Sequence, residues 1–232
     1  MQLKDKWALI TGSTRGIGQQ VAFGLAQQGC NIIVHGRKIE HAEQTLDRLK
    51  EYPVQTLVVA GELGNVEQEN AFIDTILKQL GHIDILYNNA AIMSQWSDSI
   101  YNIPMSEWQR VFEVNLFSLI RISNRFIPIM KQRNWGRVIN LSTGMRDTPQ
   151  LAPYSLSKAA LDKYTLDLVS DCKDSNVLVN AVDPGWLRTN LGGEYADYEV
   201  ESVLPGALIP ALLDDFSTSG EIYQAQDYSL QK

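Results

Sequence analysis

The stretch Trp7-Ala8-Leu9-Ile10-Thr11-Gly12-Ser13-Thr14-Arg15-Gly16-Ile17-Gly18 decides the fold of this chain. Its start, Trp7–Thr11, is a short apolar run that predicts a buried strand, and a helical pattern begins at Gly16. Glycines permit a tight turn and let a ligand approach the backbone closely. The start of the helix then offers free N–H groups and a positive dipole to a pyrophosphate group. This unit predicts dinucleotide binding, with an ordinary turn as the alternative, although its spacing is Gly-x-x-x-Gly-x-Gly rather than the commoner Gly-x-Gly-x-x-Gly.

Short apolar runs alternate with helix-period segments along the whole chain. The strands are expected at Trp7–Thr11, Asn31–Val34, Val54–Ala60, Ile83–Tyr87, Arg137–Leu141, Val177–Val182 and, more weakly, near Glu221–Tyr223. The helices are expected at Gly16–Gln28, Ile39–Glu51, Val66–Leu80, Ser106–Arg133 and Pro153–Lys173, with a kink in the fourth at Pro128. The strands lack a period of two and are therefore expected to be buried on both faces. Strands that alternate with helices predict an α/β fold, in which a parallel sheet is covered by helices on both sides.

Composition limits the classes of protein to consider. The 232 residues contain no linker or repeat, so we expect one domain over residues 1–232, with a long irregular segment from Thr189 to about Pro210. A net charge of −7 argues against nucleic acid as a partner. No stretch approaches the roughly 18 apolar residues of a membrane span, and Met1–Lys6 lacks a signal-peptide core. The two cysteines show no pairing pattern, which indicates a cytoplasmic location, and the three histidines lack metal-ligand spacing, so no metal is expected.

The end of the second expected strand, His35-Gly36-Arg37-Lys38, bears on the choice of cofactor. An NAD-dependent protein normally has Asp or Glu there to bind the 2′-hydroxyl of the ribose. Gly36 takes that place here and Arg37 follows it, while Arg15 lies in the glycine turn. Guanidinium groups suit phosphate recognition, so this strand end predicts NADP(H) rather than NAD(H). Solvated loop charges are the alternative interpretation of Arg37 and Lys38.

The segment Tyr154-Ser155-Leu156-Ser157-Lys158 is the candidate for proton transfer. Residues four apart on a helix share one face, with their Cβ atoms about 5–6 Å apart. A nearby ammonium group favours the phenolate, so we expect Lys158 to lower the pKa of Tyr154 by roughly 1–3 pH units from about 10. The same spacing recurs at Tyr228 and Lys232, in the last residues of the sequence, and we interpret that copy as coincidence.

In this order, Thr11–Gly18, Asn88-Asn89-Ala90-Ala91, Asn115 and the Tyr154/Lys158 pair resemble the motifs of the short-chain dehydrogenase/reductase family. The resemblance covers nearly the whole chain, and the motifs are specific jointly rather than singly. It implies a single Rossmann-like domain, whose doubly wound parallel sheet of about seven strands binds the dinucleotide across the carboxyl ends of the strands. Family members commonly pair through the two helices expected at 106–133 and 153–173, which implies a homodimer or homotetramer.

The resemblance also implies which residues bind the cofactor. The turn residues Gly12, Gly16 and Gly18 would line the pyrophosphate, together with Thr14, Arg15 and Ile17. The remaining contacts would come from Arg37, Glu62, Leu63, Asn89, Ala90, Ala91, Tyr154, Lys158, Pro184, Gly185, Trp186, Leu187 and Thr189. Glu62 and Ala91 depart from the family pattern, which usually has Asp and Gly at these places.

For the chemistry, the resemblance implies that Tyr154 is the general acid when a carbonyl is reduced and the base in the reverse reaction. Lys158 would lower the pKa of Tyr154 and bind hydroxyl groups of the nicotinamide ribose, and Asn115 would hold a water that relays the proton. A further hydroxyl would bond the substrate oxygen, and Thr143 and Ser142 are both candidates. The count from the start of the strand favours Thr143, whereas Ser142 is the usual residue type one step away. Neighbouring side chains of an extended chain point opposite ways, so the two are distinct choices.

Bulky apolar residues on the expected loops indicate the class of substrate. They are Met93, Trp96, Met145, Leu151, Trp186, Leu191, Tyr195 and Tyr198. Such side chains line small-molecule sites, so we expect an apolar or aromatic aldehyde or ketone. The predicted function is that of an NADP(H)-dependent oxidoreductase acting on a carbonyl or alcohol. The alternative is an NADP(H)-binding regulatory or scaffold protein with reduced catalysis.

Overall fold

A computed structural model describes residues 3–145 and 147–229, so Lys232 of the second Tyr-x-x-x-Lys copy lies outside the described residues. The strands form one parallel sheet in the order β3-β2-β1-β4-β5-β6-β7. Their bounds are β1 (Trp7–Ile10), β2 (Asn31–Gly36), β3 (Thr56–Ala60), β4 (Ile85–Asn88), β5 (Gly136–Leu141), β6 (Val177–Asp183) and β7 (Ile222–Gln224). The predicted strands are confirmed, with ends that differ by no more than two residues.

The helices lie where the sequence predicts them, with one interruption. They are α1 (Gly16–Gln27), α2 (Glu43–Leu49), α3 (Val66–Leu80), α4 (Met105–Phe112), α5 (Ser118–Gln132) and α6 (Ala152–Cys172). The prediction of one continuous helix over Ser106–Arg133 is wrong, because a π turn at Glu113–Phe117 separates α4 from α5. The helix predicted at Ile39–Glu51 begins as a 3-10 turn, Ile39–Ala42, before α2. Helix α5 continues through Pro128 to Gln132.

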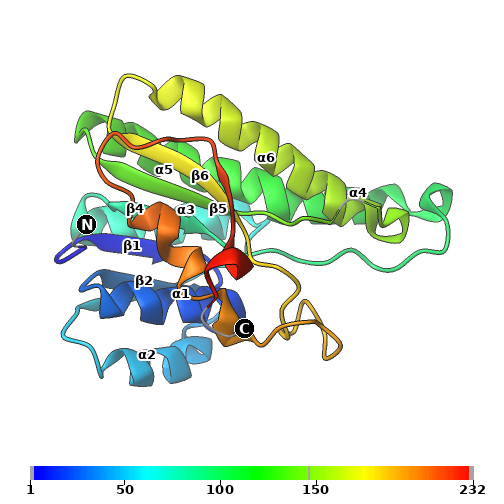
Figure 1. Ribbon diagram of the computed structural model, residues 1–232, viewed down its shortest axis with the longest axis horizontal. Coiled ribbons are helices and arrows are strands. Elements are labelled where there is room, and N and C mark those ends of the chain that lie inside the picture. Colours follow the sequence, from blue (N-terminus) through cyan, green and yellow to red (C-terminus); the bar gives the residue numbers. More distant parts are fainter. Residues whose placement is uncertain (1–2, 146, 230–232) are drawn as a thin grey trace.

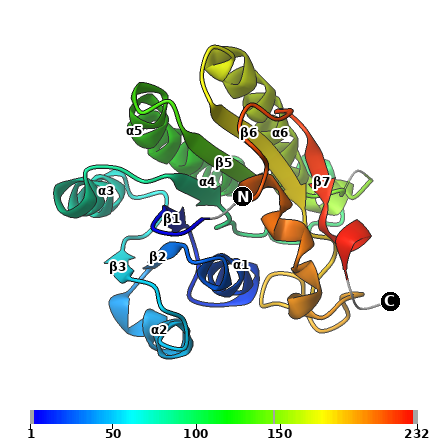
Figure 2. The same cartoon turned by 60° about the vertical axis from the view of Figure 1, so that its left-hand side comes forward.

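Helices cover both faces of the sheet (Figures 1 and 2). Helices α1 and α2 lie on one face, together with a 3-10 turn at Gly206–Ala211, and α3, α5 and α6 lie on the other. Strand β1 shows how the layers form, since Ala8 and Ile10 pack toward α1 whereas Leu9 packs toward α3. Every residue of β2, β4, β5 and β6 is buried. The expectation that the strands are buried on both faces is confirmed for these four.

The parallel arrangement brings the loops that follow the strands to one edge of the sheet. The chain order reverses between β1 and β4, and a crevice forms at such a point outside the carboxyl ends of the strands. The segment predicted to be irregular, 189–210, contains a 3-10 turn at Val200–Val203 and the start of the one at Gly206–Ala211. No helix in the described part of the chain is both long enough and apolar enough to cross a membrane.

Candidate active site

The glycine turn after β1 is shaped for close approach. Gly12 and Gly16 have φ of +68° and +59°, a left-handed conformation that glycine adopts without strain. A Cβ on Gly18 would lie 2.5 Å from the side-chain nitrogen of Asn89 and 2.7 Å from the carbonyl oxygen of Gly12. That nitrogen donates to the carbonyl oxygen of Thr11 at 2.8 Å. The loop after β4, with Asn89, Ala90 and Ala91, therefore packs directly on the turn.

Helix α1 starts at Gly16 with its first N–H groups available. Arg15, the residue before the helix, is extended, and its side chain makes no capping hydrogen bond. The first turn of a helix has no carbonyl partners of its own for these N–H groups. Thr189 lies beside them, since a Cβ on Gly16 would contact its methyl group at 3.6 Å. Two segments predicted to bind the cofactor, 12–18 and 184–189, thus meet at the start of α1.

The buried side chain and backbone of His35 bond the glycine turn at Gly12 and Ser13. The backbone N–H of Gly12 donates to Nδ1 of His35 at 3.2 Å, and the N–H of Ser13 donates to the carbonyl oxygen of His35 at 3.0 Å. Burial lowers the pKa of His35 to about 4, so the ring is neutral at pH 7 and Nδ1 is free to accept. Nothing in the sequence around residue 35 indicates this contact with Gly12.

The end of β2 has no room for an acidic side chain. A Cβ on Gly36 would lie 2.5 Å from the methyl group of Thr14, closer than such contacts occur. Arg15, Arg37 and Lys38 are exposed, and no acidic side chain among residues 3–145 and 147–229 forms an ion pair with them. These features fit the 2′-phosphate of NADP(H), which needs free cations and no nearby carboxylate.

The residues after β3 behave less uniformly than expected. Glu62 is exposed, and its backbone N–H donates to the side chain of Gln68 at 2.8 Å. Leu63 is buried in the core between the sheet and α3. Of these two predicted cofactor residues, Glu62 alone therefore presents its side chain to solvent.

Tyr154 and Lys158 both lie on the buried side of α6. Nζ of Lys158 donates to the carbonyl oxygen of Leu141 at 2.5 Å and lies 5.9 Å from the centre of the Tyr154 ring. Burial, together with the charge of Asp183, raises the pKa of Tyr154 to about 12. Burial lowers the pKa of Lys158 to about 8. The expected net lowering of the Tyr154 pKa is therefore wrong, because burial disfavours the phenolate and the Lys158 ammonium group donates to a carbonyl instead.

The two candidate hydroxyls point to different partners. The Ser142 hydroxyl donates to Oδ1 of Asp162 at 2.5 Å and is buried between β5 and α6. The Thr143 side chain lies beside the Tyr154 hydroxyl, where it acts to lower the pKa of that group. The geometry brings Thr143, and not Ser142, to the Tyr154 hydroxyl.

Asn115 lies in the π turn between α4 and α5, and both N–H donors of its side chain are used. Its Oδ1 accepts from the N–H of Ile92 at 2.8 Å. Its Nδ2 donates to the carbonyl oxygen of Ile92 at 3.0 Å and to the hydroxyl of Ser157 at 3.1 Å. Ser157 is the neighbour of Lys158 on α6, so Asn115 ties the loop after β4 to the helix that carries the tyrosine.

The segment after β6 forms an ordered turn at the mouth of the site. Gly185 has φ of +78°, and its N–H donates to Oδ1 of Asp183 at 3.0 Å. Leu187 forms an isolated bridge with Tyr198, and the Trp186 ring nitrogen donates to the carbonyl oxygen of Gly192 at 2.8 Å. The residues predicted at 184–189 therefore form one wall of the site together with the 192–198 loop.

Several of the bulky residues predicted to contact substrate are exposed at this edge. Trp96, Trp186, Leu191, Tyr195 and Tyr198 are exposed, and Met93, Met145 and Leu151 are half-buried. The N–H of Ser97 donates to the carbonyl oxygen of Gln150 at 3.2 Å, which joins the loop of Trp96 to that of Leu151. In the described part of the chain, no group of three or more His, Cys, Asp or Glu side chains is arranged to hold a metal ion.

Comparison with known proteins places this geometry in context. A family model described as short chain dehydrogenase matches residues 6–199. The uncharacterized oxidoreductase YvrD of Bacillus subtilis is 37% identical over 187 residues, which are 80% of this chain and 70% of that protein. A gluconate 5-dehydrogenase from Burkholderia cenocepacia, in complex with NADP and tartrate, is similar with a TM-score of 0.84 and 25% identity over 96% of this chain and 94% of that one. An NAD+-bound xylitol dehydrogenase has a TM-score of 0.86 and 22% identity over 97% and 98%. The cofactors of these two structures differ, so their similarity does not decide between NAD(H) and NADP(H).

Proposed function

The chain belongs to the short-chain dehydrogenase family, an oxidoreductase family, and on that premise we propose that it interconverts apolar or aromatic aldehydes or ketones and their alcohols with NADP(H). The contact between Thr143 and Tyr154 carries this proposal. The hydroxyl groups of two neighbouring side chains such as these can both donate a hydrogen bond to one carbonyl oxygen. Tyr154 keeps its proton at neutral pH, since its pKa is raised to about 12, which suits a proton donor in carbonyl reduction. Thr143 would stabilise the negative charge that develops on the same oxygen.

NADPH would supply the hydride for this reduction. The glycine turn and the first N–H groups of α1 would hold the pyrophosphate. Arg15 and Arg37 would hold the 2′-phosphate, which the missing side chain at Gly36 leaves without a competing carboxylate. Lys158, buried beneath the site, would bind hydroxyl groups of the nicotinamide ribose through the donors that Leu141 does not use.

The proposed proton relay through Asn115 rests on its main chain. The side chain already bonds Ile92 and Ser157, and these bonds take both of its N–H donors. A π turn replaces the regular i+4 hydrogen bonds with i+5 bonds and often marks a functional site. We therefore assign the relay water to the main-chain carbonyl of Asn115.

An NADPH-oxidation assay over aromatic and aliphatic aldehydes, ketones and quinones tests the proposed function. Tyr154→Phe should abolish turnover while NADPH binding persists. Thr143→Val should lower kcat by roughly 10²–10³-fold, as for a lost oxyanion donor, and Ser142→Ala should keep most of the activity. The opposite order for these two variants, or full activity in Tyr154→Phe, would overturn the assignment. NADPH binding with no turnover of any substrate would favour the alternative of a binding protein.

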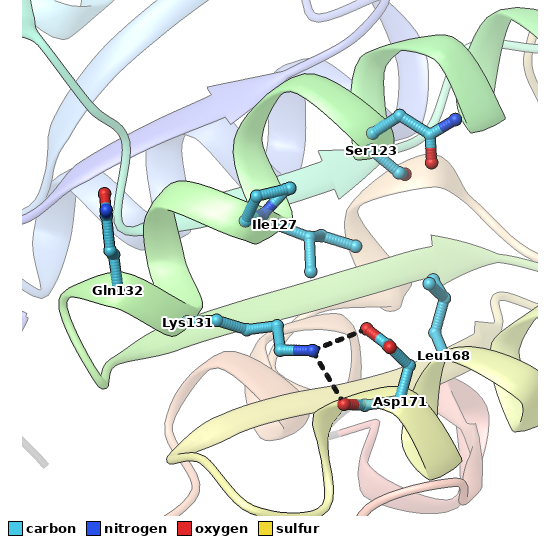
Figure 3. Close-up of a pocket in the computed structure, with 8 residues that line it drawn as sticks. Ser123, Ile127, Lys131, Gln132, Leu168 and Asp171 are labelled. Carbon is cyan, nitrogen blue, oxygen red and sulfur yellow. Dashed lines mark hydrogen bonds and ion pairs between the residues drawn. The ribbon is translucent and has the colours of Figure 1, made fainter.

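We also propose that two copies of the chain pair through α5 and α6. A surface hollow of about 650 Å³ lies between these helices, and Lys131 crosses it to bond the Asp171 carboxylate at 2.8 Å (Figure 3). Exposed apolar side chains flank the same helices, including Phe117 just before α5 and Leu156 on α6. A partner of the same sequence would cover this apolar surface and fill the hollow.

We propose a cytoplasmic location for the protein. Cys30 and Cys172 are free, buried thiols, and burial raises the pKa of both. Thiols of this kind suit a reducing compartment, where no disulfide forms. Immunofluorescence or fractionation of the full chain in its source cells checks the location.

A further inference from the structure

Asp183, the last residue of β6, has surroundings that are unusual for a carboxylate. It is 8% exposed, and its Oδ1 accepts one hydrogen bond, from the N–H of Gly185. Within residues 3–145 and 147–229, no cation forms an ion pair with it. A buried carboxylate without a cation is costly unless it is hydrogen-bonded on both oxygens.

The second oxygen of Asp183 reaches the exposed end of β5. A Cβ on Gly144 would lie 2.7 Å from Oδ2, so a side chain at position 144 would cover this oxygen. Gly144 is itself exposed, and it follows Thr143, which lies beside Tyr154. The Asp183 charge acts on Tyr154 from this place. The carboxylate therefore borders the point at which Thr143 and Tyr154 would receive a carbonyl oxygen.

We propose that Asp183 determines substrate specificity. It selects carbonyl compounds that carry a hydroxyl or ammonium group on the carbon next to the carbonyl. It rejects compounds that carry a carboxylate at that position. This inference rests on the function proposed above. An α-hydroxy ketone would donate its hydroxyl proton in a hydrogen bond to Oδ2 while its carbonyl oxygen accepts from Thr143 and Tyr154. With NADPH as the hydride donor, the carbonyl carbon would gain a hydride as its π bond breaks, and Tyr154 would transfer its proton to the oxygen, so the product would be a 1,2-diol. An α-keto acid would instead bring a second negative charge against Asp183.

Removal of the Asp183 charge has a second effect that the test must separate. Its charge favours the protonated form of Tyr154, so an uncharged residue would change the rate with every ketone. A substrate with neither a donor nor a charge beside the carbonyl reports that general effect. The ratio of kcat/KM between substrates therefore isolates recognition by Asp183.

Three phenyl ketones that differ in one group test the proposal: 2-hydroxyacetophenone, acetophenone and phenylglyoxylate. The unaltered protein should prefer 2-hydroxyacetophenone over acetophenone by about tenfold or more in kcat/KM, the effect of a hydrogen bond to a charged acceptor. It should use phenylglyoxylate at least about tenfold less well than acetophenone. Asp183→Asn keeps an acceptor for Gly185 but removes the charge. This variant should raise kcat/KM for phenylglyoxylate relative to that for acetophenone by about tenfold. It should also reduce the preference for 2-hydroxyacetophenone.

Two further variants serve as controls for Asp183→Asn. Asp183→Ser, whose hydroxyl also accepts from a backbone N–H two residues on, replaces the Asn variant if that one fails to fold. Asp174→Asn removes the same charge from an exposed site in the turn before β6, at the opposite end of the strand that carries Asp183, and should leave all ratios unchanged. Ratios that are the same within about twofold in the unaltered protein, Asp183→Asn and Asp183→Ser would overturn the role of Asp183 alone. Failure of the unaltered protein to oxidise NADPH with any of the three ketones and with the wider panel would overturn the proposed function, and this inference with it.

Discussion

Gly36→Asp should reverse the cofactor preference only when Thr14 is changed to Ser in the same chain. The acidic residue restores the group that NAD-dependent proteins use to bind the 2′-hydroxyl of the ribose. Its Cβ, however, would lie 2.5 Å from the methyl group of Thr14 and 3.6 Å from the Thr14 hydroxyl oxygen. Serine lacks that methyl group and keeps the hydroxyl. In the double variant the Cβ of residue 36 therefore meets only the hydroxyl oxygen of residue 14, at an ordinary contact distance.

The structure sets the magnitudes. Gly36 is buried at the end of β2 and accepts a hydrogen bond from the N–H of Gly61, so its backbone has little freedom to move. Overpacking of this kind costs about 1–3 kcal/mol, or roughly 2–12 °C in the unfolding midpoint of a chain of this size. A carboxylate against a 2′-phosphate costs several kcal/mol, and about 3 kcal/mol corresponds to roughly a hundredfold change in the ratio of kcat/KM for NADPH and NADH.

A double-mutant cycle checks both parts of this prediction. Thermal unfolding and kcat/KM for NADPH and NADH are measured for the unaltered protein, Thr14→Ser, Gly36→Asp and the double variant. Thr14→Ser should keep the NADPH preference, Gly36→Asp should lose stability, and the double variant should recover stability and prefer NADH. No recovery of stability would refute the packing argument. A retained NADPH preference in a stable double variant would refute the assignment of this strand end to the 2′-phosphate.

Three further predictions concern other parts of the chain. The pKa of His35 in the folded chain is about 4, below the ordinary value of about 6.5. Between these two pH values the unfolded chain binds more protons than the folded one. The free energy of unfolding should therefore fall by about 3 kcal/mol as the pH drops from about 6.5 to about 4. Urea unfolding should show a smaller acid loss for His35→Gln, and an equal loss would disprove the role of His35. Asn124→Arg adds a charge to the hollow between α5 and α6 and should yield monomers in sedimentation. The matched Gln79→Arg, which adds the same charge on the exposed side of α3, should not, and a monomeric unaltered protein would count against the pairing. Alcohol oxidation needs Tyr154 as a base, and since its pKa is raised to about 12 the rate should climb from about pH 7 to about pH 10; a plateau below about pH 8 would point to another base.

The sequence predicts the sheet and most helices because their signals are local. Apolar runs such as Asn31–Val34 and Val177–Val182 are continuous, and continuous runs belong to strands that are buried on both faces. The glycines of 12–18 have a local role as well, since positive φ at Gly12 and Gly16 depends on the turn itself. For these elements tertiary structure adds only the exact ends.

The π turn between α4 and α5 has no such local signal. Its residues, Glu113–Phe117, fit an uninterrupted helix in composition and period. What accompanies the interruption is a set of long-range hydrogen bonds from Asn115 to Ile92 and Ser157, which lie 23 and 42 residues away along the chain. His35 and Asp183 escape local analysis for the same reason, since their burial and their contacts with the 12–13 and 144 backbones arise only in the folded chain.

The choice between Ser142 and Thr143 shows where local rules stop. Extended backbone predicts that the two hydroxyls point opposite ways, but not which of them meets α6 at Tyr154. The folded chain has Asp162, two turns along the same helix, as the partner of Ser142 and leaves Thr143 for the tyrosine. The local rule says that only one of the two hydroxyls can face Tyr154, and the position of α6 determines that it is Thr143.

The Tyr154/Lys158 pair needs the same correction for its electrostatics. On an exposed helix the ammonium group would stabilise the phenolate, and the tyrosine would become more acidic. Burial disfavours the charged form of each group, so it raises the pKa of the phenol and lowers that of the ammonium, and the carboxylate of Asp183 acts on the phenol in the same sense. A phenol that holds its proton at neutral pH is a donor ready for a developing alkoxide, whereas it must first lose that proton to act as a base. The raised pKa of Tyr154 therefore agrees with the carbonyl reduction proposed above. Asp183→Asn, which removes one of the influences that retain the proton, should shift the alkaline rise of alcohol oxidation to lower pH.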